Sequence, residues 1–177
     1  MAEKSKKDKV DLKVDLEVLK NTLDRYVTGN NAKDKEIQYT ASLFLNWLNT
    51  KTNLINNEKS FKKPDDFELK RGKVVWVDFG FNIGTEFGGK HPAVILRVSG
   101  EKVFVVPLSS QKPDDPSKDM FVEVDKVYQL KPMKRWVNVL NMVGVSVQRI
   151  DFTNSTGRVN GKVLDNISNA LNKVGIK

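Results

Sequence analysis

The fold is decided by residues Pro92–Leu108, which read PAVILRVSGEKVFVVPL. Two apolar runs rich in β-branched residues flank Ser99-Gly100-Glu101, a composition typical of a β-hairpin turn. Pro92 begins the first run, where the loss of a backbone N–H is tolerated. We therefore expect two neighbouring antiparallel strands, Pro92–Val98 and Lys102–Leu108.

Short β-rich runs on both sides of this hairpin extend the predicted sheet. Lys73–Phe79 (KVVWVDF) precedes it, Met120–Val124 follows it, and Trp136–Val147 holds one long bent strand or two, with Gly144 as the bend. Asn160 caps a final helix, whose apolar face consists of Val163, Ile167, Leu171 and Val174. About five short strands and a C-terminal helix are typical of an SH3-like small β-barrel, which belongs to the α+β class.

The N-terminal part carries helical rather than strand periodicity. Apolar residues recur at alternating spacings of four and three at Leu12, Leu16, Leu19, Leu23 and Tyr26. A second apolar stripe follows at Ile37, Ala41, Phe44, Leu48 and Ile55. Gly29-Asn30-Asn31 separates the two stripes as a helix cap and turn would. The pattern predicts an N-terminal helical hairpin, and neither helix can bury its stripe alone.

Composition changes near residue 67, and this change predicts two domains. Residues 1–67 comprise an N-terminal basic tail, the helical hairpin and a linker over residues 57–67. We expect the first ten residues of the tail to be disordered. Residues 68–177 comprise the β-barrel domain and carry most of the net positive charge.

The composition of the 177 residues excludes several classes of site. There are 30 Lys and Arg residues against 22 Asp and Glu, which gives a net charge of +8, and there is no Cys. Disulfides, thiolate zinc sites and cysteine nucleophiles are therefore excluded, and the single histidine, His91, excludes a multi-histidine metal site. No apolar run approaches the ~18 residues that cross a bilayer, so we expect no membrane partner and a cytoplasmic location. The positive charge favours a polyanionic partner, or serves solubility alone.

Residues Phe81–Pro92 (FNIGTEFGGKHP) form the most informative segment for chemistry. The segment is too long for a simple hairpin turn, and it contains the loop glycines Gly84, Gly88 and Gly89. Glycines let backbone N–H groups approach a ligand and let a loop move. The segment also carries a carboxylate, an ammonium and an imidazole, at Glu86, Lys90 and His91. The plain alternative is a flexible connection with incidental charge and a structural histidine.

Two further segments carry groups that could bind RNA. Ser109, Ser110 and Gln111 end the third predicted strand, where hydroxyl and amide groups can bind a phosphate or a base, although they are also ordinary turn formers. Residues 128–136 interleave basic and aromatic side chains, which is how single-stranded RNA is usually held. The alternative for this segment is a solvated loop with Trp136 in the core. Its candidate phosphate contacts are Lys131, Lys134 and Arg135.

With these pieces in order, residues 71–150 resemble the MazF/PemK family of toxin endoribonucleases. The matching segments are Arg71–Phe79, Gly84–Leu96, Val105–Gln111 and Val145–Ile150, and the terminal helix fits as well. The resemblance does not extend to residues 1–67, which the short members of the family lack.

The resemblance implies an SH3-like barrel, a homodimer, and cleavage of single-stranded RNA, including mRNA, at short sequences without metal or other cofactor. In the family the 2′-hydroxyl is the nucleophile, and the products carry a cyclic phosphate and a 5′-hydroxyl. A cognate antitoxin protein usually neutralises the toxin by covering the RNA groove. The sequence departs from the family pattern at His91, where the family has arginine, and at Leu140-Asn141, where some members have an acidic residue and Gln.

Two hypotheses follow for the β-rich domain. As an endoribonuclease, it would use His91 as general acid or base, Lys90 and Ser109 as phosphate stabilisers, and Glu86 to order the loop or assist proton transfer. RNA contacts would then come from Ser110, Gln111, Lys131, Lys134, Arg135 and Arg149. The alternative is a non-catalytic RNA- or protein-binding module, which the replaced arginine and acid favour. The helical hairpin would serve dimerisation, antitoxin docking or covering of the RNA groove, or would be a structural appendage.

Overall fold

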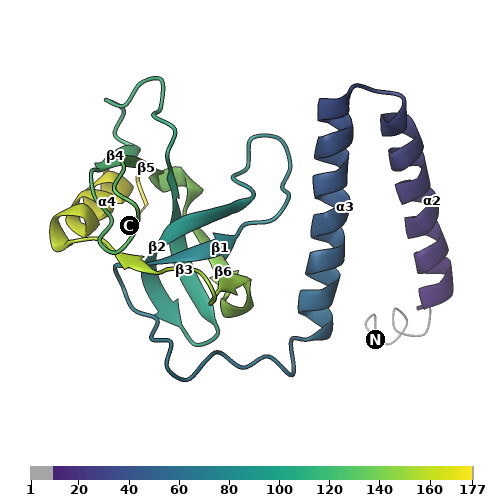
Figure 1. Cartoon of the computed structure of the whole chain (residues 1–177), viewed down its shortest axis with the longest axis horizontal. Coiled ribbons are helices and arrows are strands. Elements are labelled where there is room, and N and C mark those ends of the chain that lie inside the picture. The colour runs from purple at the N-terminus through teal and green to yellow at the C-terminus, as the bar shows by residue number, and fades with distance from the viewer. Residues whose placement is uncertain (1–9, 177) are drawn as a thin grey trace, which may run out of the picture. The chain divides into compact units, whose positions relative to one another are not determined.

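The computed structural model of the chain describes residues 10–176 and separates them into two compact units, Met1–Lys51 and Thr52–Lys177 (Figure 1). The predicted division into residues 1–67 and 68–177 rests on composition and stays a prediction. The expected disorder of residues 1–10 concerns positions that, apart from Val10, lie outside the described residues. No helix within residues 10–176 is long and apolar enough to cross a membrane.

The predicted helical hairpin is confirmed as two helices, α2 (Leu12–Asn31) and α3 (Lys35–Asn56). Asp11 caps α2, because its carboxylate accepts hydrogen bonds from the backbone N–H groups of Lys13 and Val14 at 3.0 and 3.3 Å. Near the turn between the helices, the rings of Tyr26 and Phe44 meet edge to face with their centroids 5.0 Å apart. This ring pair joins α2 to α3.

The apolar stripe of α2 is largely solvent-exposed. None of the side chains of α2 is buried, and Leu12, Leu16 and Leu19 remain 74%, 50% and 45% exposed. In α3, Ala41 is the one buried residue among those described. The hairpin therefore has a small core, and its helices depend on capping and on local pairs as much as on burial.

The second unit is built around an antiparallel β-sheet (Figure 1). Its strands are β1 (Lys73–Asp78), β2 (Lys90–Ser99), β3 (Lys102–Ser109), β4 (Phe121–Val124), β5 (Arg135–Asn138), β6 (Val143–Ser146), β7 (Ile150–Asp151) and β8 (Gly157–Arg158). The strand order is β4-β5-β3-β2-β1-β7, while β6 pairs with β3 and β8 pairs with β1. The predicted small β-fold with a C-terminal helix, α4 (Gly161–Lys173), is confirmed, but the sheet of the described residues does not close into a complete barrel.

The hairpin predicted from Pro92–Leu108 forms the centre of this sheet. β2 and β3 pair in antiparallel register from Ala93 opposite Pro107 to Ser99 opposite Lys102, with a bulge between Ile95 and Arg97. The segment for which one or two strands were expected contains β5 and β6, separated by the short 3-10 helix η1 (Val139–Asn141). A second 3-10 helix, η2 (Val147–Arg149), leads into β7.

Alternation along the strands divides the apolar side chains into two clusters. The first contains Val74, Val94 and Val106 and is covered by α4 through Ile167 and Ala170. The second contains Val75, Ala93, Ile95 and Val105 on the opposite face of the same strands. Because both clusters are built from buried valines and isoleucines, the strands hold the loops between them on a rigid base.

The segment indicated as a linker packs on the second cluster. Phe61 and Phe67 lie against Phe152, with ring centroids 6.3 and 4.8 Å apart, and all three rings contact the cluster. The ammonium of Lys73 lies 3.9 Å from the ring centroid of Phe67. Residues 61–69 are thus part of the folded second unit rather than a free tether.

Candidate functional site

The glycine-rich loop between β1 and β2 is closed by backbone hydrogen bonds at its base. The N–H of Gly89 donates to the Gly80 carbonyl at 2.7 Å, and the N–H of Phe79 donates to the Gly89 carbonyl at 2.8 Å. A Cβ atom at Gly88 would lie only 2.8 Å from the Gly80 carbonyl oxygen, so the close approach requires glycine there. Gly84 and Gly89 have φ values of +59° and +79°, which also favour glycine.

Two side chains stiffen the tip of this loop. The Asn82 amide donates to the carbonyl of Phe87 at 2.6 Å and to that of Phe79 at 3.2 Å. The Glu86 carboxylate accepts the backbone N–H of Ile83 at 3.1 Å, which supports the expected role of Glu86 in ordering the loop. The loop therefore presents the Phe87 side chain in a defined position.

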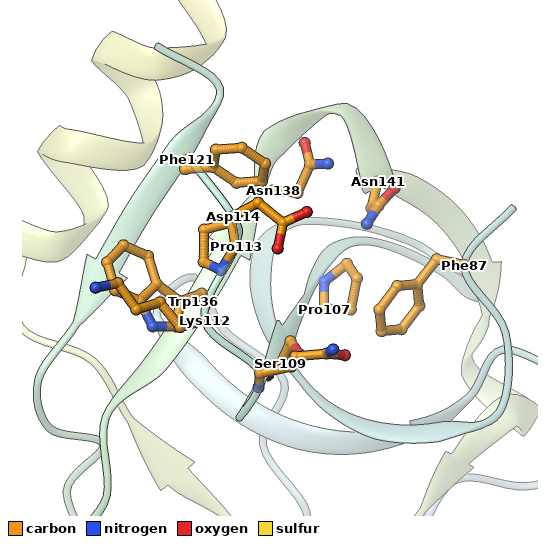
Figure 2. A pocket seen from close by; sticks show the side chains of 11 residues that line it. Phe87, Pro107, Ser109, Lys112, Pro113, Asp114, Phe121, Trp136, Asn138 and Asn141 are labelled. Atoms are coloured by element: carbon orange, nitrogen blue, oxygen red, sulfur yellow. Dashed lines mark hydrogen bonds between the residues drawn. The ribbon is translucent and has the colours of Figure 1, made fainter. Parts of the chain in front are cut away.

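A first cavity of about 340 Å³ lies between this loop and the end of β3. It is lined by Phe87, Pro107, Ser109, Gln111, Lys112, Pro113, Asp114, Phe121, Trp136, Asn138 and Asn141. Figure 2 shows these side chains around the cavity, with Phe87 and Trp136 on opposite sides. The Ser109 hydroxyl accepts the backbone N–H of Gln111 at 3.0 Å, which fixes the turn that follows β3. Aromatic walls with amide and hydroxyl groups suit a nucleobase with its phosphate.

A second cavity of similar size, about 340 Å³, shares two lining residues, Phe87 and Asn141, with the first. Its other lining residues are Phe79, Asn82, Glu86, Leu140, Met142, Val143, Val145 and Arg149. Because the two cavities meet at Phe87 and Asn141, a chain molecule could occupy both at once. Glu86 and Arg149, predicted from separate segments, are brought to the same cavity.

His91 contacts Phe87, which lines both cavities, but His91 itself lines neither. The rings of His91 and Phe87 pack with centroids 4.7 Å apart, and the imidazole is partly buried. Burial lowers the pKa of His91, because the protonated ring loses water. Strand alternation puts His91 on the face of Ala93 and Ile95, and puts Ser109 on the matching face of β3 with Val105.

Lys90 is engaged in an ion pair with Asp151. The same carboxylate accepts the N–H and the hydroxyl of Thr153 at 2.8 and 2.6 Å, and the amide of Asn154 at 2.7 Å. These hydrogen bonds, with that of Lys90 first, hold the pKa of Asp151 well below its usual range. The pair joins the start of β2 to the end of β7.

Arg149 is held at the second cavity by the end of β1. Its Nε donates to the Asp78 carbonyl at 2.7 Å, and the side chain is partly buried. Burial lowers the pKa of Arg149, while the carboxylate of Asp78 acts in the opposite direction. The guanidinium nevertheless remains charged at every pH at which proteins fold.

The basic segment after β4 is engaged mainly with protein groups. Arg135 is only 6% exposed, and its guanidinium donates to the carbonyls of Lys131 and Met133 at 3.3–3.4 Å. Lys134 pairs with Glu123, which raises the pKa of the lysine, and it lies 3.6 Å from Asp125. Lys131 and Ser110 have exposed side chains. Trp136 is buried, with 9% of its surface exposed, as the alternative for this segment expected.

Most residues that line the first cavity were not predicted as site residues from the sequence, among them Phe87, Asn138 and Asn141. A single aromatic residue inside a polar, glycine-rich loop was the available signal for Phe87. Asn138 caps the 3-10 helix η1 and Asn141 is its last residue, and sequence periodicity does not reveal so short a helix. Within residues 10–176, no group of three or more His, Asp or Glu side chains is arranged to hold a metal ion.

The second unit is thus a small β-domain with an open antiparallel sheet, a C-terminal helix and cavities at one glycine loop, and comparison with known proteins identifies its family. The family described as PemK-like, MazF-like toxin of type II toxin–antitoxin system matches residues 70–175. The chain belongs to this family, which confirms the resemblance seen in the sequence.

Solved structures are similar to the chain at low sequence identity, and the first of them has the same fold. MazF (Form-I) from Deinococcus radiodurans is 18% identical, with a TM-score of 0.50 over 62% of this chain and 97% of that chain. The MazE-MazF complex (Form-II) from the same organism is 18% identical, with a TM-score of 0.46 over 63% of this chain and 100% of that chain. The toxin MazF-mt6 from Mycobacterium tuberculosis is 15% identical, with a TM-score of 0.44 over 56% of this chain and 92% of that chain. No curated protein sequence matches the chain.

Proposed function

We propose that the protein is the toxin of a type II toxin–antitoxin system and cleaves single-stranded RNA, including mRNA, at specific short sequences. One observation carries the proposal: within the family-matched residues, Phe87 of the glycine loop and Ser109 at the end of β3 line the same cavity. These are the two segments in which the sequence places the candidate catalytic groups. The reaction is metal-independent attack by the 2′-hydroxyl.

His91 is the proposed general base. Its lowered pKa keeps the imidazole neutral near pH 7, which is the form that accepts the 2′-hydroxyl proton. The 2′ oxygen then bonds to phosphorus and the bond from phosphorus to the 5′ oxygen breaks. The 5′ oxygen takes up a proton from water, and His91 returns its proton to the solvent. The products are a 2′,3′-cyclic phosphate and a 5′-hydroxyl. Because Phe87 stands between His91 and the cavities, its side chain has to move when RNA binds.

The other candidates have supporting roles in this proposal. Ser109 hydrogen-bonds the phosphate, Ser110 and Gln111 contact the neighbouring nucleotide, and Glu86 holds the loop. Because Lys90 is paired with Asp151, it binds a phosphate only if it leaves the Asp151 carboxylate. The exposed ammonium groups of Lys131 and Lys134 contact flanking phosphates, whereas buried Arg135 supports their segment.

Family membership also bears on partners. A toxin of a type II toxin–antitoxin system is expected to have a cognate antitoxin protein, and we propose that the antitoxin covers the cavities at Phe87. We further propose that the protein acts as a homodimer in the cytoplasm. The hairpin of α2 and α3 lies outside the family-matched residues, so its role in assembly, docking or covering is separate from the chemistry.

The decisive experiment incubates the full chain with a mixed RNA and sequences the new 5′ ends. We expect reproducible sites with 5′-hydroxyl ends, unchanged by a chelator. His91→Ala should lower the cleavage rate at least ~10²-fold, the typical value of general acid–base help. Arg97→Ala is a matched control, because Arg97 is exposed on β2 and lines neither cavity. RNA that stays intact with the wild-type protein contradicts the proposal.

A second candidate function is a non-catalytic RNA-binding module. The position of His91 behind Phe87 and the pairing of Lys90 with Asp151 favour it, because neither group faces a cavity directly. Such a module would leave RNA intact but bind it with an affinity that falls steeply with salt. Filter binding at increasing salt concentrations, beside the sequencing experiment, separates the two functions.

A further inference from the structure

Cleavage of a phosphodiester by an internal hydroxyl builds negative charge on the phosphorus oxygens. When the 2′ oxygen bonds to phosphorus, the phosphorus becomes pentacoordinate and its two free oxygens carry more charge than in the substrate. A fixed cation or a set of aligned donors lowers that barrier, and one such group is typically worth ~10²–10³-fold in rate. A neutral His91 cannot supply this charge while it acts as the base.

Two of the candidate cations, Lys90 and Arg135, line neither cavity. Lys90 is paired with Asp151, whose carboxylate is anchored by Thr153 and Asn154. Arg135 is buried against backbone carbonyls. The two cations that line the paired cavities are Lys112 in the first and Arg149 in the second. The choice of the charged group therefore lies between these two.

Arg149 has the better-defined position of the two. Its Nε is fixed at 2.7 Å from the Asp78 carbonyl, next to the base of the glycine loop, and its side chain is partly buried. Lys112 is exposed on the polar loop after β3. A charge held in a partly desolvated wall interacts more strongly with a phosphate than an exposed ammonium, and it needs no reorganisation during the reaction.

Arg149 also shares its cavity with the loop that carries the other candidate groups. The second cavity contains Glu86 and Asn82 of the glycine loop, and it meets the first cavity at Phe87 and Asn141. A phosphodiester seated at Asn141, with the Phe87 ring moved aside to uncover His91, would therefore lie between Ser109 on one side and Arg149 on the other. This places a hydroxyl donor and a guanidinium around one phosphorus.

We propose that Arg149, acting from the second cavity, is the catalytic residue that neutralises the charge on the phosphorus oxygens; this inference rests on the proposed RNA cleavage. In the step, the 2′-hydroxyl proton passes to His91 and the oxygen–phosphorus bond forms while the guanidinium binds both free oxygens. The bond to the 5′ oxygen then breaks, that oxygen takes a proton from water, and the protonated His91 returns its proton to the solvent. Arg149 exchanges no proton and leaves the reaction unchanged.

The test compares single-turnover cleavage and RNA binding for wild type, Arg149→Ala, Arg149→Lys and Lys112→Ala. We expect Arg149→Ala to lose ~10²–10³-fold in cleavage rate while its RNA affinity changes by less than ~10-fold. Guanidinium ion at millimolar concentration should restore at least ~10-fold of the lost rate in Arg149→Ala but none in His91→Ala. Arg149→Lys should keep part of the rate, because it keeps the charge but not the two-pronged geometry. Lys112→Ala should stay within a few-fold of wild type.

Any other result overturns either the assignment of Arg149 or the proposed nuclease function. Cleavage by Arg149→Ala at the wild-type rate, or a loss of rate matched by an equal loss of binding, refutes the catalytic assignment while leaving the nuclease intact. A large loss in Lys112→Ala with none in Arg149→Ala assigns the charge to Lys112 instead. If Arg149→Ala melts below the assay temperature, Arg149→Lys replaces it as the test, and a thermal melt shows whether that variant is folded. Folded Arg149→Lys that cleaves at the full wild-type rate refutes the need for a guanidinium. Intact RNA with the wild type refutes the proposed function itself.

Discussion

The ring of Phe87 lies edge-on against the imidazole of His91, with 4.7 Å between the ring centroids. The contact joins a glycine-loop residue to a β2 residue, and it separates the only histidine of the chain from the two neighbouring cavities. Several measurable properties of His91 therefore depend on Phe87.

Replacing Phe87 by Ala should raise the pKa of His91 toward its ordinary value. Burial is the cause of the lowered pKa, and removal of the ring lets water reach the imidazole. Because the chain has one histidine, a proton NMR titration of its Cε1–H resonance reads this pKa without overlap. Leu140→Ala, which shortens an exposed lining residue of the second cavity, is the control and should leave the pKa where it is.

The lowered pKa of the His91 imidazole makes the stability of the fold depend on pH. A histidine whose folded pKa lies below its unfolded value binds more protons when unfolded, so the free energy of unfolding falls as pH drops below about 6.5. Urea unfolding at pH 8, 7, 6 and 5.5 measures this slope. In His91→Gln the slope over that interval should flatten, and an unchanged slope would show that His91 is not its source.

The two members of the ion pair between Lys90 and Asp151 should contribute unequally to the free energy of unfolding. Asp151→Ala removes the acceptor of hydrogen bonds from Lys90, Thr153 and Asn154, and we expect it to cost ~1–3 kcal/mol of unfolding free energy. Lys90→Met removes one half-exposed ammonium and should cost no more than ~1 kcal/mol. Chemical denaturation of both variants measures the difference.

The Asp151 carboxylate also predicts acid sensitivity. Its folded pKa is lowered, so its contribution is present above its ordinary value near 3.8 and is lost as pH falls further below it. Wild type and Asp151→Ala should therefore converge in stability as pH is lowered below 4. Parallel curves down to pH 2 would contradict the hydrogen-bonded carboxylate.

Gly88→Ala should distort the glycine loop, because its Cβ would lie 2.8 Å from the Gly80 carbonyl oxygen. The obstacle is backbone rather than a flexible side chain, so we expect a loss of ~1–3 kcal/mol. Gly161→Ala is the matched control, since nothing lies within 4 Å of its Cβ position and it begins α4. Thermal unfolding compares the two, and equal melting temperatures would contradict the close approach.

The N-terminal unit should be removable at residue 51 but not at residue 67. Deleting residues 1–67 removes Phe61 and Phe67 from the second apolar cluster, whereas deleting residues 1–51 keeps both. Phe67→Ala alone should cost ~2–4 kcal/mol, somewhat less than a fully buried phenylalanine. Unfolding of the two truncated chains and of Phe67→Ala by urea tests the expectation, and equal stability of both deletions would exclude a packing role for the segment.

The elements that could be read from the sequence were those with local, strong patterns. Pro92–Leu108 combines β-branched runs with a glycine turn, and both strands and the turn between them were predictable from it, whereas the bulge between Ile95 and Arg97 was not. The stripes of α2 and α3 were equally clear as helices, yet periodicity does not tell how deeply a stripe is buried, and Leu12 is 74% exposed.

The candidate site was predictable in residue type but less so in arrangement. Lys90 and Asp151 are 61 residues apart in the chain, and only the pairing of β1 with β2 and β7 brings them together. Arg135 is a charged residue in a basic run, a pattern that usually means solvent exposure, but it is buried because its guanidinium finds backbone carbonyls. Such outcomes depend on tertiary contacts that no local pattern encodes.

Phe61, Phe67 and Phe87 are all seated on one group of buried side chains. A change in that cluster therefore affects both residues 61–69, which follow α3, and the Phe87 ring that covers His91. Loss of Phe67 should therefore expose the His91 imidazole to more water, although Phe67 and Phe87 are 20 positions apart along the chain. Residues 61–69 and the glycine loop that carries the candidate chemistry thus depend on one apolar cluster, on the face of the sheet opposite the one that α4 covers.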